Sequence, residues 1–168
     1  YKRLVQYNDP AMVTPTLNAL AEDGVILDRF YAAATCTPAR AALMTGRLGI
    51  RTGMQDSVIH ATEPRGVPLD EVFLGEKLQS AGYRTAMVGK WHLGWDFDAI
   101  RKPGAKKGDP RAESYDWSKG IPDGPLDQVF DYYFGDGTIN FPPYCWIEGD
   151  RFVTIPTKPV IKSRPLAG

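Results

Sequence analysis

The chain has 168 residues, of which 43% are hydrophobic and 24% charged, which is ordinary for one globular domain and excludes disordered, collagen-like and disulfide-rich classes. Its 20 basic and 20 acidic residues cancel, so no overall field favours nucleic acid or an anionic membrane, and any anion site must be local. No apolar run of about 18 residues is present, so no membrane span is expected.

Two elements are predicted before the first cysteine. Thr14 and Pro15 suit the N-cap and first position of a short helix, and Gly24 suits the residue that ends it. An apolar run over residues 25–31 then predicts a buried strand, because such runs are typical of strands covered on both faces. This strand would lead the chain to Cys36.

Helices and strands are predicted to alternate further along. A second helix is expected to begin at Pro38, with Thr37 as its cap. Apolar side chains over residues 69–81 recur at helical spacing and predict a third helix, followed by a strand over residues 83–88. The alternation is typical of an α/β domain with a largely parallel central sheet flanked by helices.

The chain changes in character after residue 95. Residues 1–95 hold the predicted α/β core, where ligand-contacting groups usually follow the carboxyl ends of strands, as Cys36 and Lys90 are expected to do. Residues 96–168 hold nine of the 14 prolines, which predicts long surface loops. Aromatic side chains near residues 132–146 are expected to dock part of this region on the core.

A thiol beside a predicted helix start is a candidate anion site. Unpaired amides and the helix dipole favour negative charge there, and Arg40, one turn after Cys36, can return toward the same point. From the residues alone, a buried structural cysteine is the alternative, because cysteine is among the most buried residue types. A surface ion pair is the alternative for Arg40. Spacing alone leaves both alternatives open.

Residues 36–40 (CTPAR) and 43–47 (LMTGR) resemble the signature of the type I sulfatases. The resemblance implies that Cys36 is oxidised to formylglycine by a formylglycine-generating enzyme that recognises the Cys-x-Pro-x-Arg pattern. A hydrated aldehyde offers one hydroxyl that attacks sulfur and a second whose deprotonation expels sulfate. The resemblance also implies that Arg40 stabilises this hydrate, and that the fold is an alkaline phosphatase-like sulfatase catalytic domain, here truncated at both ends.

Residues 82–92 resemble the second signature of the same family. By that resemblance, Lys90 binds a sulfate oxygen and offsets charge as the S–O bond breaks, while His92 hydrogen-bonds the formylglycine hydroxyls and moves protons. Because Lys90 and His92 are two residues apart on a chain expected to be extended, their side chains should point the same way. Without the family, the pair would be typical of an exposed turn.

The other histidine and the other cysteine have no catalytic motif around them. His60 is expected to have a structural or rim role. Cys145 is interpreted as a packed thiol, although residues 142–148 resemble a segment of bacterial arylsulfatases that would line the approach to the site.

Weaker resemblances bear on the substrate. Residues 51–55 and 67–71 resemble arylsulfatase B-type enzymes, which act on sulfated sugars, so a sulfated glycan or an aryl sulfate is expected as substrate. Residues 130–135 resemble a Gly-Phe-Asp-x-Phe-Phe-Gly segment of sulfatases, with Val129 in place of the first glycine.

The family binds a divalent cation, usually calcium, through an Asp-Asp pair on the first strand and a later Asp-Asn pair. Neither pair can be placed in this sequence, because residues 1–7 follow the expected first pair and neither Asp136 nor Asp150 precedes an asparagine. Modified Cys36 is therefore the metal contact expected from this chain. We expect the chain to be the front portion of a longer enzyme, inactive alone, and periplasmic, secreted or lysosomal by family habit.

Three functions compete at this level. Sulfate ester hydrolysis through Cys36, Arg40, Lys90 and His92 is the leading hypothesis. A phosphatase or phosphodiesterase of the alkaline phosphatase superfamily is the second, although those enzymes normally present serine or threonine as nucleophile. A catalytically inactive sulfatase-like fragment that retains the pocket without the metal is the third.

Overall fold

The computed structural model describes residues 14–60, 62–109, 111–128, 130–137 and 144–155. The chain divides into two compact units, residues 1–32 and residues 33–168. In the described part of the chain, no helix combines the length and apolar character that crossing a bilayer requires. The predicted change of structure at residue 95 does not coincide with this division and stays a prediction.

The first unit contains one described helix, α2 (Pro15–Asp23), which confirms the predicted helix. Thr14 is its N-cap residue and Gly24 follows its last turn. The strand predicted over residues 25–31 is wrong: the segment is irregular, and the side chains of Val25 and Tyr31 are 85% and 89% exposed. A strand requires a neighbour for its backbone groups, and the described residues of this unit provide none.

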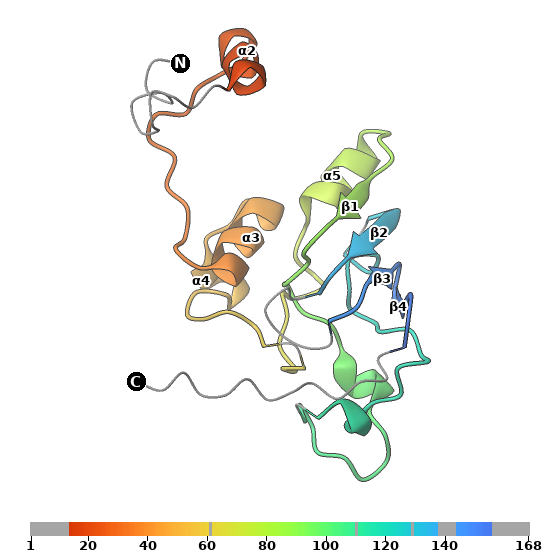
Figure 1. Cartoon of the computed structure of the whole chain (residues 1–168). Coiled ribbons are helices and arrows are strands. Elements are labelled where there is room, and N and C mark those ends of the chain that lie inside the picture. Colours follow the sequence, from red (N-terminus) through yellow and green to blue (C-terminus); the bar gives the residue numbers. More distant parts are fainter. Residues whose placement is uncertain (1–13, 61, 110, 129, 138–143, 156–168) are drawn as a thin grey trace. The chain divides into compact units, whose positions relative to one another are not determined.

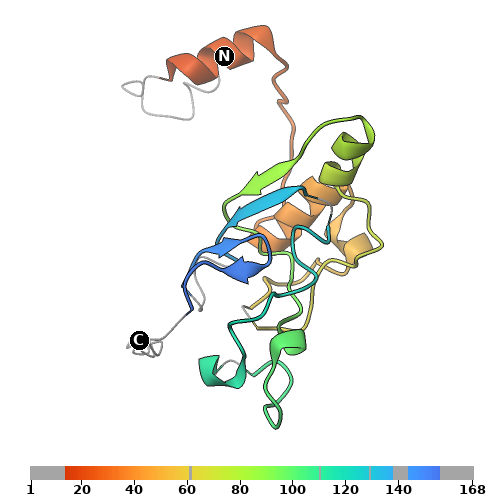
Figure 2. The same cartoon turned by 90° about the vertical axis from the view of Figure 1, so that its right-hand side faces the viewer.

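Three helices lie in the second unit: α3 (Cys36–Thr45), α4 (Gly49–Thr52) and α5 (Leu74–Ser80). Helix α3 ends at Gly46, whose φ of 67° is left-handed and whose N–H donates to the carbonyl of Ala42. Figures 1 and 2 show α3 beside one face of the sheet.

Two helices begin at residues other than those predicted. Helix α3 begins at Cys36 with Thr35 as its N-cap residue, so Thr37 is the second helical residue and not the cap. Helix α5 begins at Leu74 because the residues before it form turns, in which the Glu71 N–H donates to the carbonyl of Pro68 (3.1 Å). The predicted helix over residues 69–81 is therefore confirmed only in its second half.

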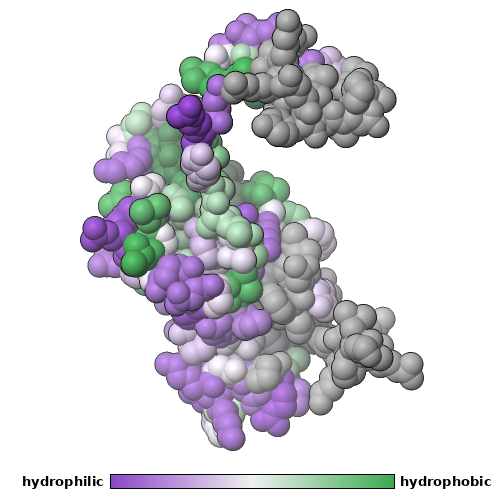
Figure 3. Space-filling model, turned by 90° about the vertical axis from the view of Figure 1, so that its left-hand side faces the viewer, coloured by the Kyte–Doolittle hydropathy of each residue, from purple (hydrophilic) through white to green (hydrophobic). Residues whose placement is uncertain are grey.

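The buried side of α3 carries Thr37, Pro38 and Ala41. Leu43 on the same helix and Leu48 beyond it are instead exposed, by 64% and 75%. Figure 3 views the molecule from the side on which α3 and α4 lie in Figure 1, and it shows apolar side chains gathered among polar ones there. Thr37, the residue after Cys36, therefore faces the interior, whereas Leu43 and Leu48 face outward.

The sheet has four strands in the order β1 (Ala86–Val88), β2 (Tyr132–Gly135), β3 (Ile147–Glu148) and β4 (Arg151–Phe152). β1 and β2 are parallel, and the other two neighbouring pairs are antiparallel. The predicted α/β class is confirmed, with a mixed sheet among the described strands. Of the strand predicted over residues 83–88, only the last three residues pair.

A carboxylate joins the starts of the two parallel strands. Asp131 Oδ2 accepts hydrogen bonds from the Thr85 N–H (2.6 Å) and the Thr85 hydroxyl (3.2 Å), and the Asp131 N–H donates to the Thr85 carbonyl (3.0 Å). The Thr85 amide holds the pKa of Asp131 below its usual range. These bonds hold β1 in register with β2, and Lys90 follows two residues after the end of β1.

Several side chains of the hydrophobic core come from the region predicted as surface loops. Ile100, Tyr115 and Ile121 are each at most 1% exposed. Two short 3-10 helices, Phe97–Ile100 and Ala112–Ser114, place part of this region. The surface-loop prediction was wrong here because prolines interrupt regular structure without preventing burial of the apolar side chains between them.

A close backbone approach after the second signature gives a stability prediction. Gly94 has a φ of 108°, and a Cβ at this position would lie 2.3 Å from Gly66 Cα. Gly104 has a φ of 84° with no atom within 4 Å of such a Cβ. We expect Gly104→Ala to lower the free energy of unfolding by about 1 kcal/mol through backbone strain alone, and Gly94→Ala by about 3 kcal/mol or more through strain plus overlap.

Urea unfolding followed by tryptophan fluorescence measures both variants. Equal losses at Gly94 and Gly104 would contradict the close approach between residues 66 and 94.

Candidate active site

The tip of α3 positions the predicted nucleophile. Thr35 is extended (φ −120°, ψ 156°), and Cys36 is the first residue of the helix, half-buried and not in a disulfide. The first amides of a helix lack partners within it, and its dipole favours negative charge at this end. An anion attached to Cys36 would therefore be stabilised by the backbone before any side chain contributes.

Arg40 connects this helix to the segment that follows β1. Its Nε donates to the carbonyl of Trp91 (2.8 Å), and its Nη2 donates to the carbonyl of Lys90. Burial lowers the pKa of the guanidinium, while Tyr133 and Cys36 act electrostatically in the opposite direction. Arginine remains charged in proteins and has five N–H donors, so Arg40 can hold this backbone and an anion at the same time.

The segment with the second signature continues along the end of β2. The N–H groups of Gly89 and His92 donate to the carbonyls of Phe134 (2.9 Å) and Gly137 (2.9 Å). The expectation of an extended chain here was wrong, because His92 has a φ of 58° and Gly89 a φ of 108°. These turns, rather than strand alternation, set the directions of the Lys90 and His92 side chains.

His92 is 2% exposed, and its Nε2 lies 2.6 Å from the carbonyl oxygen of Ile59. Burial lowers the pKa of its imidazole, the bond to Ile59 raises it, and the charges of Lys90, Arg40 and His60 lower it further. The net lowering favours a neutral ring at neutral pH, which is the form that accepts a proton.

The structure brings the four predicted residues together. Arg40 interacts electrostatically with both Cys36 and His92, and it is hydrogen-bonded to the backbone of Lys90. Lys90 is half-buried and its charge acts on His92. His60 is exposed, in agreement with the expected rim position, and its charge also acts on His92. The catalytic roles of these residues stay a prediction.

Cys145 differs from a reactive thiol. It is half-buried and in no disulfide, and burial together with the nearby Asp136 raises its pKa to about 12. A thiol with this pKa is almost entirely protonated at neutral pH and therefore a poor nucleophile. This agrees with its interpretation as a packed thiol.

The described residues do not fit a calcium site by themselves. Within them, no three His, Cys, Asp or Glu side chains lie close enough together to hold a metal ion. Calcium takes six to eight oxygen ligands. Residues 1–7, next to which the first aspartate pair was expected, lie outside the described residues.

Two members of the site were missed by sequence reasoning. The carbonyl of Ile59 contacts the His92 ring, and a backbone group carries no sequence signal. Thr37 was predicted to cap the helix, but its hydroxyl bonds to the backbone of Ile59 and His92 instead. No sequence pattern indicates these contacts, because the burial of Thr37 is visible only in the structure.

Comparison with known proteins identifies the family. The family model for sulfatases matches residues 1–139. The chain belongs to the sulfatase family. The sulfatase chain is 47% identical over 93 residues to arylsulfatase J from Mus musculus, covering 55% of this chain and 16% of that protein. It is 37% identical over 146 residues to N-acetylgalactosamine-6-sulfatase from Sus scrofa, covering 82% and 23%. The sulfatase chain thus spans less than a quarter of the length of either relative.

A solved structure supports the fold of the sulfatase chain. A protein described under glycosaminoglycan metabolism by Bacteroides thetaiotaomicron superposes with a TM-score of 0.64 at 29% identity, covering 83% of this chain and 26% of that one. The predicted alkaline phosphatase-like fold is confirmed.

Proposed function

We propose that this chain supplies the nucleophile and anion-binding part of an enzyme that hydrolyses sulfate esters. The observation that carries the proposal is the grouping of two cations, Arg40 and Lys90, and an imidazole of lowered pKa, His92, around the tip of α3 where Cys36 lies. This arrangement suits a tetrahedral anion attached to or approaching residue 36.

Cys36 fits the formylglycine that the family resemblance implies. The residue is half-buried, so its side chain can be reached, and the helix tip and Arg40 offer donors to the oxygens that would replace sulfur. When present, the hydrated aldehyde supplies one hydroxyl to attack sulfur and another to release sulfate. A formylglycine-generating enzyme is the maturation partner that this proposal requires.

The other side chains divide the work around residue 36. Arg40 keeps a positive charge beside residue 36, where a gem-diol oxygen would lie. Lys90 binds a sulfate oxygen and stabilises the negative charge that develops as the S–O bond to the leaving group breaks. His92, neutral at neutral pH, accepts a proton from a hydroxyl at residue 36 and later returns it.

Substrate, cation and compartment follow from resemblance. One relative is named N-acetylgalactosamine-6-sulfatase, and the description of the solved structure refers to glycosaminoglycans, so we favour a sulfated glycan over a simple aryl sulfate as the natural substrate. We also propose that the enzyme binds calcium, mainly through ligands outside the described residues. We further propose that it is exported.

An assay of two forms tests the function. This chain and a longer form of the protein are incubated with an aryl sulfate and the matching aryl phosphate, with calcium and with a chelator. We expect the longer form to hydrolyse the sulfate ester in preference to the phosphate ester, and only with calcium, while this chain alone shows no turnover.

Each contrary result has one meaning. Preference for the phosphate would favour a phosphatase or phosphodiesterase. No turnover by a longer form that carries formylglycine would favour an inactive fragment. Turnover by this chain alone would contradict the expected dependence on ligands outside it.

A further inference from the structure

The hydroxyl of Thr37 is buried beside the proposed nucleophile and bonds to two distant segments. Thr37 is 0% exposed, and its Oγ1 donates to the carbonyl of His92 (3.1 Å). The same oxygen accepts a hydrogen bond from the N–H of Ile59 (3.1 Å). A hydroxyl has one proton to donate, and that proton is used for His92.

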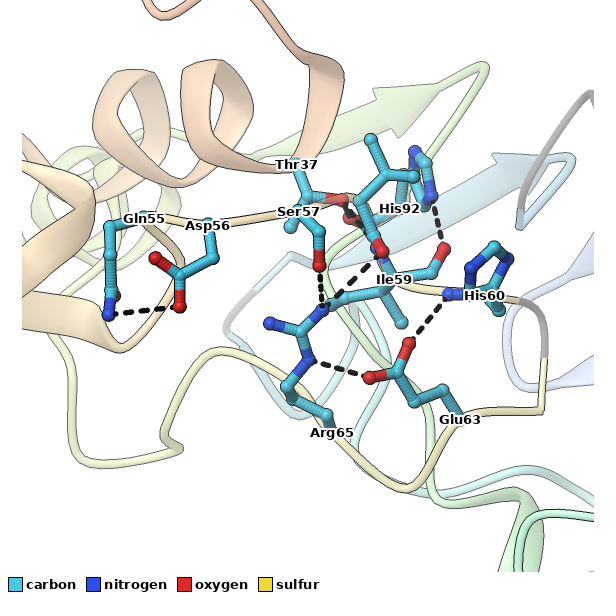
Figure 4. A network of polar contacts seen from close by, with 10 residues as sticks. Thr37, Gln55, Asp56, Ser57, Ile59, His60, Glu63, Arg65 and His92 are labelled. Atoms are coloured by element: carbon cyan, nitrogen blue, oxygen red, sulfur yellow. Dashed lines mark hydrogen bonds and ion pairs between the residues drawn. The ribbon is translucent and has the colours of Figure 1, made fainter.

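A third contact closes a ring of interactions, as Figure 4 shows. The carbonyl oxygen of Ile59 lies 2.6 Å from Nε2 of His92. A carbonyl oxygen only accepts hydrogen bonds, so Nε2 must carry the proton at this contact. In a neutral imidazole the second nitrogen, Nδ1, is then the one with the lone pair that accepts a proton.

Further hydrogen bonds hold the segment before Ile59 and the backbone of His92 in place. Arg65 donates to Val58 O (3.4 Å) and Ser57 Oγ (3.2 Å), next to Ile59, and pairs with Glu63 (2.9 Å), as Figure 4 also shows. On the other side, the His92 N–H donates to the Gly137 carbonyl (2.9 Å). The backbone of His92 is thus fixed at both its N–H and its carbonyl.

His92 needs this support because its backbone is strained. Its φ of 58° is uncommon for a residue other than glycine, and such conformations persist only where surrounding bonds determine them. The Thr37 hydroxyl provides one of these bonds and, through Ile59, orients the carbonyl that selects the ring tautomer.

We propose that Thr37 is a positioning residue whose hydroxyl locks His92 in the Nε2–H tautomer, so that Nδ1 is the ring nitrogen that can accept a proton. The tautomer and the role of the hydroxyl stand on the contacts alone. The catalytic consequence rests on the proposed sulfatase function.

The first test is the nitrogen spectrum of this chain labelled with ¹⁵N-histidine. The chain has two histidines, and His60→Gln assigns the two sets of ring signals. At a pH where the rings are neutral, long-range ¹H–¹⁵N correlations distinguish Nε2–H from Nδ1–H. We expect His92 to be in the Nε2–H form in the unaltered chain. An Nδ1–H ring overturns the proposal without any variant.

Two variants test the hydroxyl itself. Thr37→Val keeps the shape and removes the hydroxyl, whereas Thr37→Ser keeps it. We expect the valine variant to show a mixture of tautomers at His92 and the serine variant to match the unaltered chain. An unchanged His92 spectrum in the valine variant overturns the proposal. So does a valine variant that fails to fold while the serine variant folds, because the fold, and not His92, would then require the hydroxyl.

Kinetics of the longer enzyme complete the test. We expect Thr37→Val to lower kcat by about 10- to 100-fold with little change in KM, as for residues that orient a reacting group, and Thr37→Ser to restore most of it. Rates are divided by the formylglycine content of residue 36, measured by mass spectrometry, because Thr37 lies in the modified motif. A change of tautomer with an unchanged kcat overturns the positioning role of Thr37 but not the proposed sulfatase function. If instead the longer enzyme proves not to be a sulfatase, the spectra of His92 still test the tautomer.

Discussion

We expect the replacement of Cys36 by alanine to lower sulfate ester hydrolysis by the proposed enzyme by about 10⁴-fold or more, since alanine has no thiol from which the aldehyde nucleophile could be made. The effect is expected on kcat, because Arg40 and Lys90 remain in place to bind the sulfate. The fold should survive, because Cys36 is only half-buried at the end of α3 and is not a member of the hydrophobic core.

Cys145 provides the matched control. It is the other cysteine of the chain and is likewise half-buried, but its thiol is protonated at neutral pH. Steady-state rates on an aryl sulfate, with circular dichroism to verify folding, compare Cys36→Ala with Cys145→Ala. We expect near-normal rates for the second variant. Activity above a tenth of normal in Cys36→Ala would contradict a nucleophile at residue 36.

Replacing Lys90 by alanine should lower kcat by about 10²- to 10³-fold, the loss typical of removing one group that stabilises developing charge. Lys90→Arg should recover little of it, because the planar guanidinium does not reproduce a compact ammonium at the same point. Lys102→Ala, which removes an exposed lysine on the chain beyond the site, serves as the control and should leave the rate unchanged.

The same Lys90→Ala variant predicts a shift in pH dependence. The charge of Lys90 lowers the pKa of His92, and its removal raises that pKa. In the proposed mechanism the neutral ring, which exists above its pKa, is the active form, so the acid limb of the rate profile should move to higher pH. The effect is partial because burial, which is the largest cause, and Arg40 remain. A shift to lower pH would contradict the proximity of Lys90 and His92.

The sequence predicted that Cys36 and Arg40 lie at the tip of a helix, but it predicted several of the elements around them wrongly. A helix tip at residue 36, with Arg40 one turn later, follows from local spacing, and the structure differs only in beginning α3 two residues earlier. That small difference matters, because Thr37 is then not the cap but a buried residue whose hydroxyl bonds to Ile59 and His92. These partners lie 22 and 55 positions further along the chain. Contacts at such separations leave no periodic signal.

Other failures have the same physical origin. The apolar run over residues 25–31 has the composition of a buried strand, but composition does not provide a pairing partner, and its side chains are exposed. Conversely, the proline-rich region after residue 95 has no regular period, but Ile100, Tyr115 and Ile121 from it are buried. Tertiary packing decided both cases, against the local pattern.

The chemical state of residue 36 tests the central claim most directly. The protein is produced in a host with an active formylglycine-generating enzyme, and the peptide that contains residue 36 is analysed by mass spectrometry with and without an aldehyde-reactive reagent. An aldehyde at residue 36, with Cys145 unchanged, is the predicted result. An unmodified thiol at Cys36 in protein that hydrolyses sulfate esters at its full rate would contradict it.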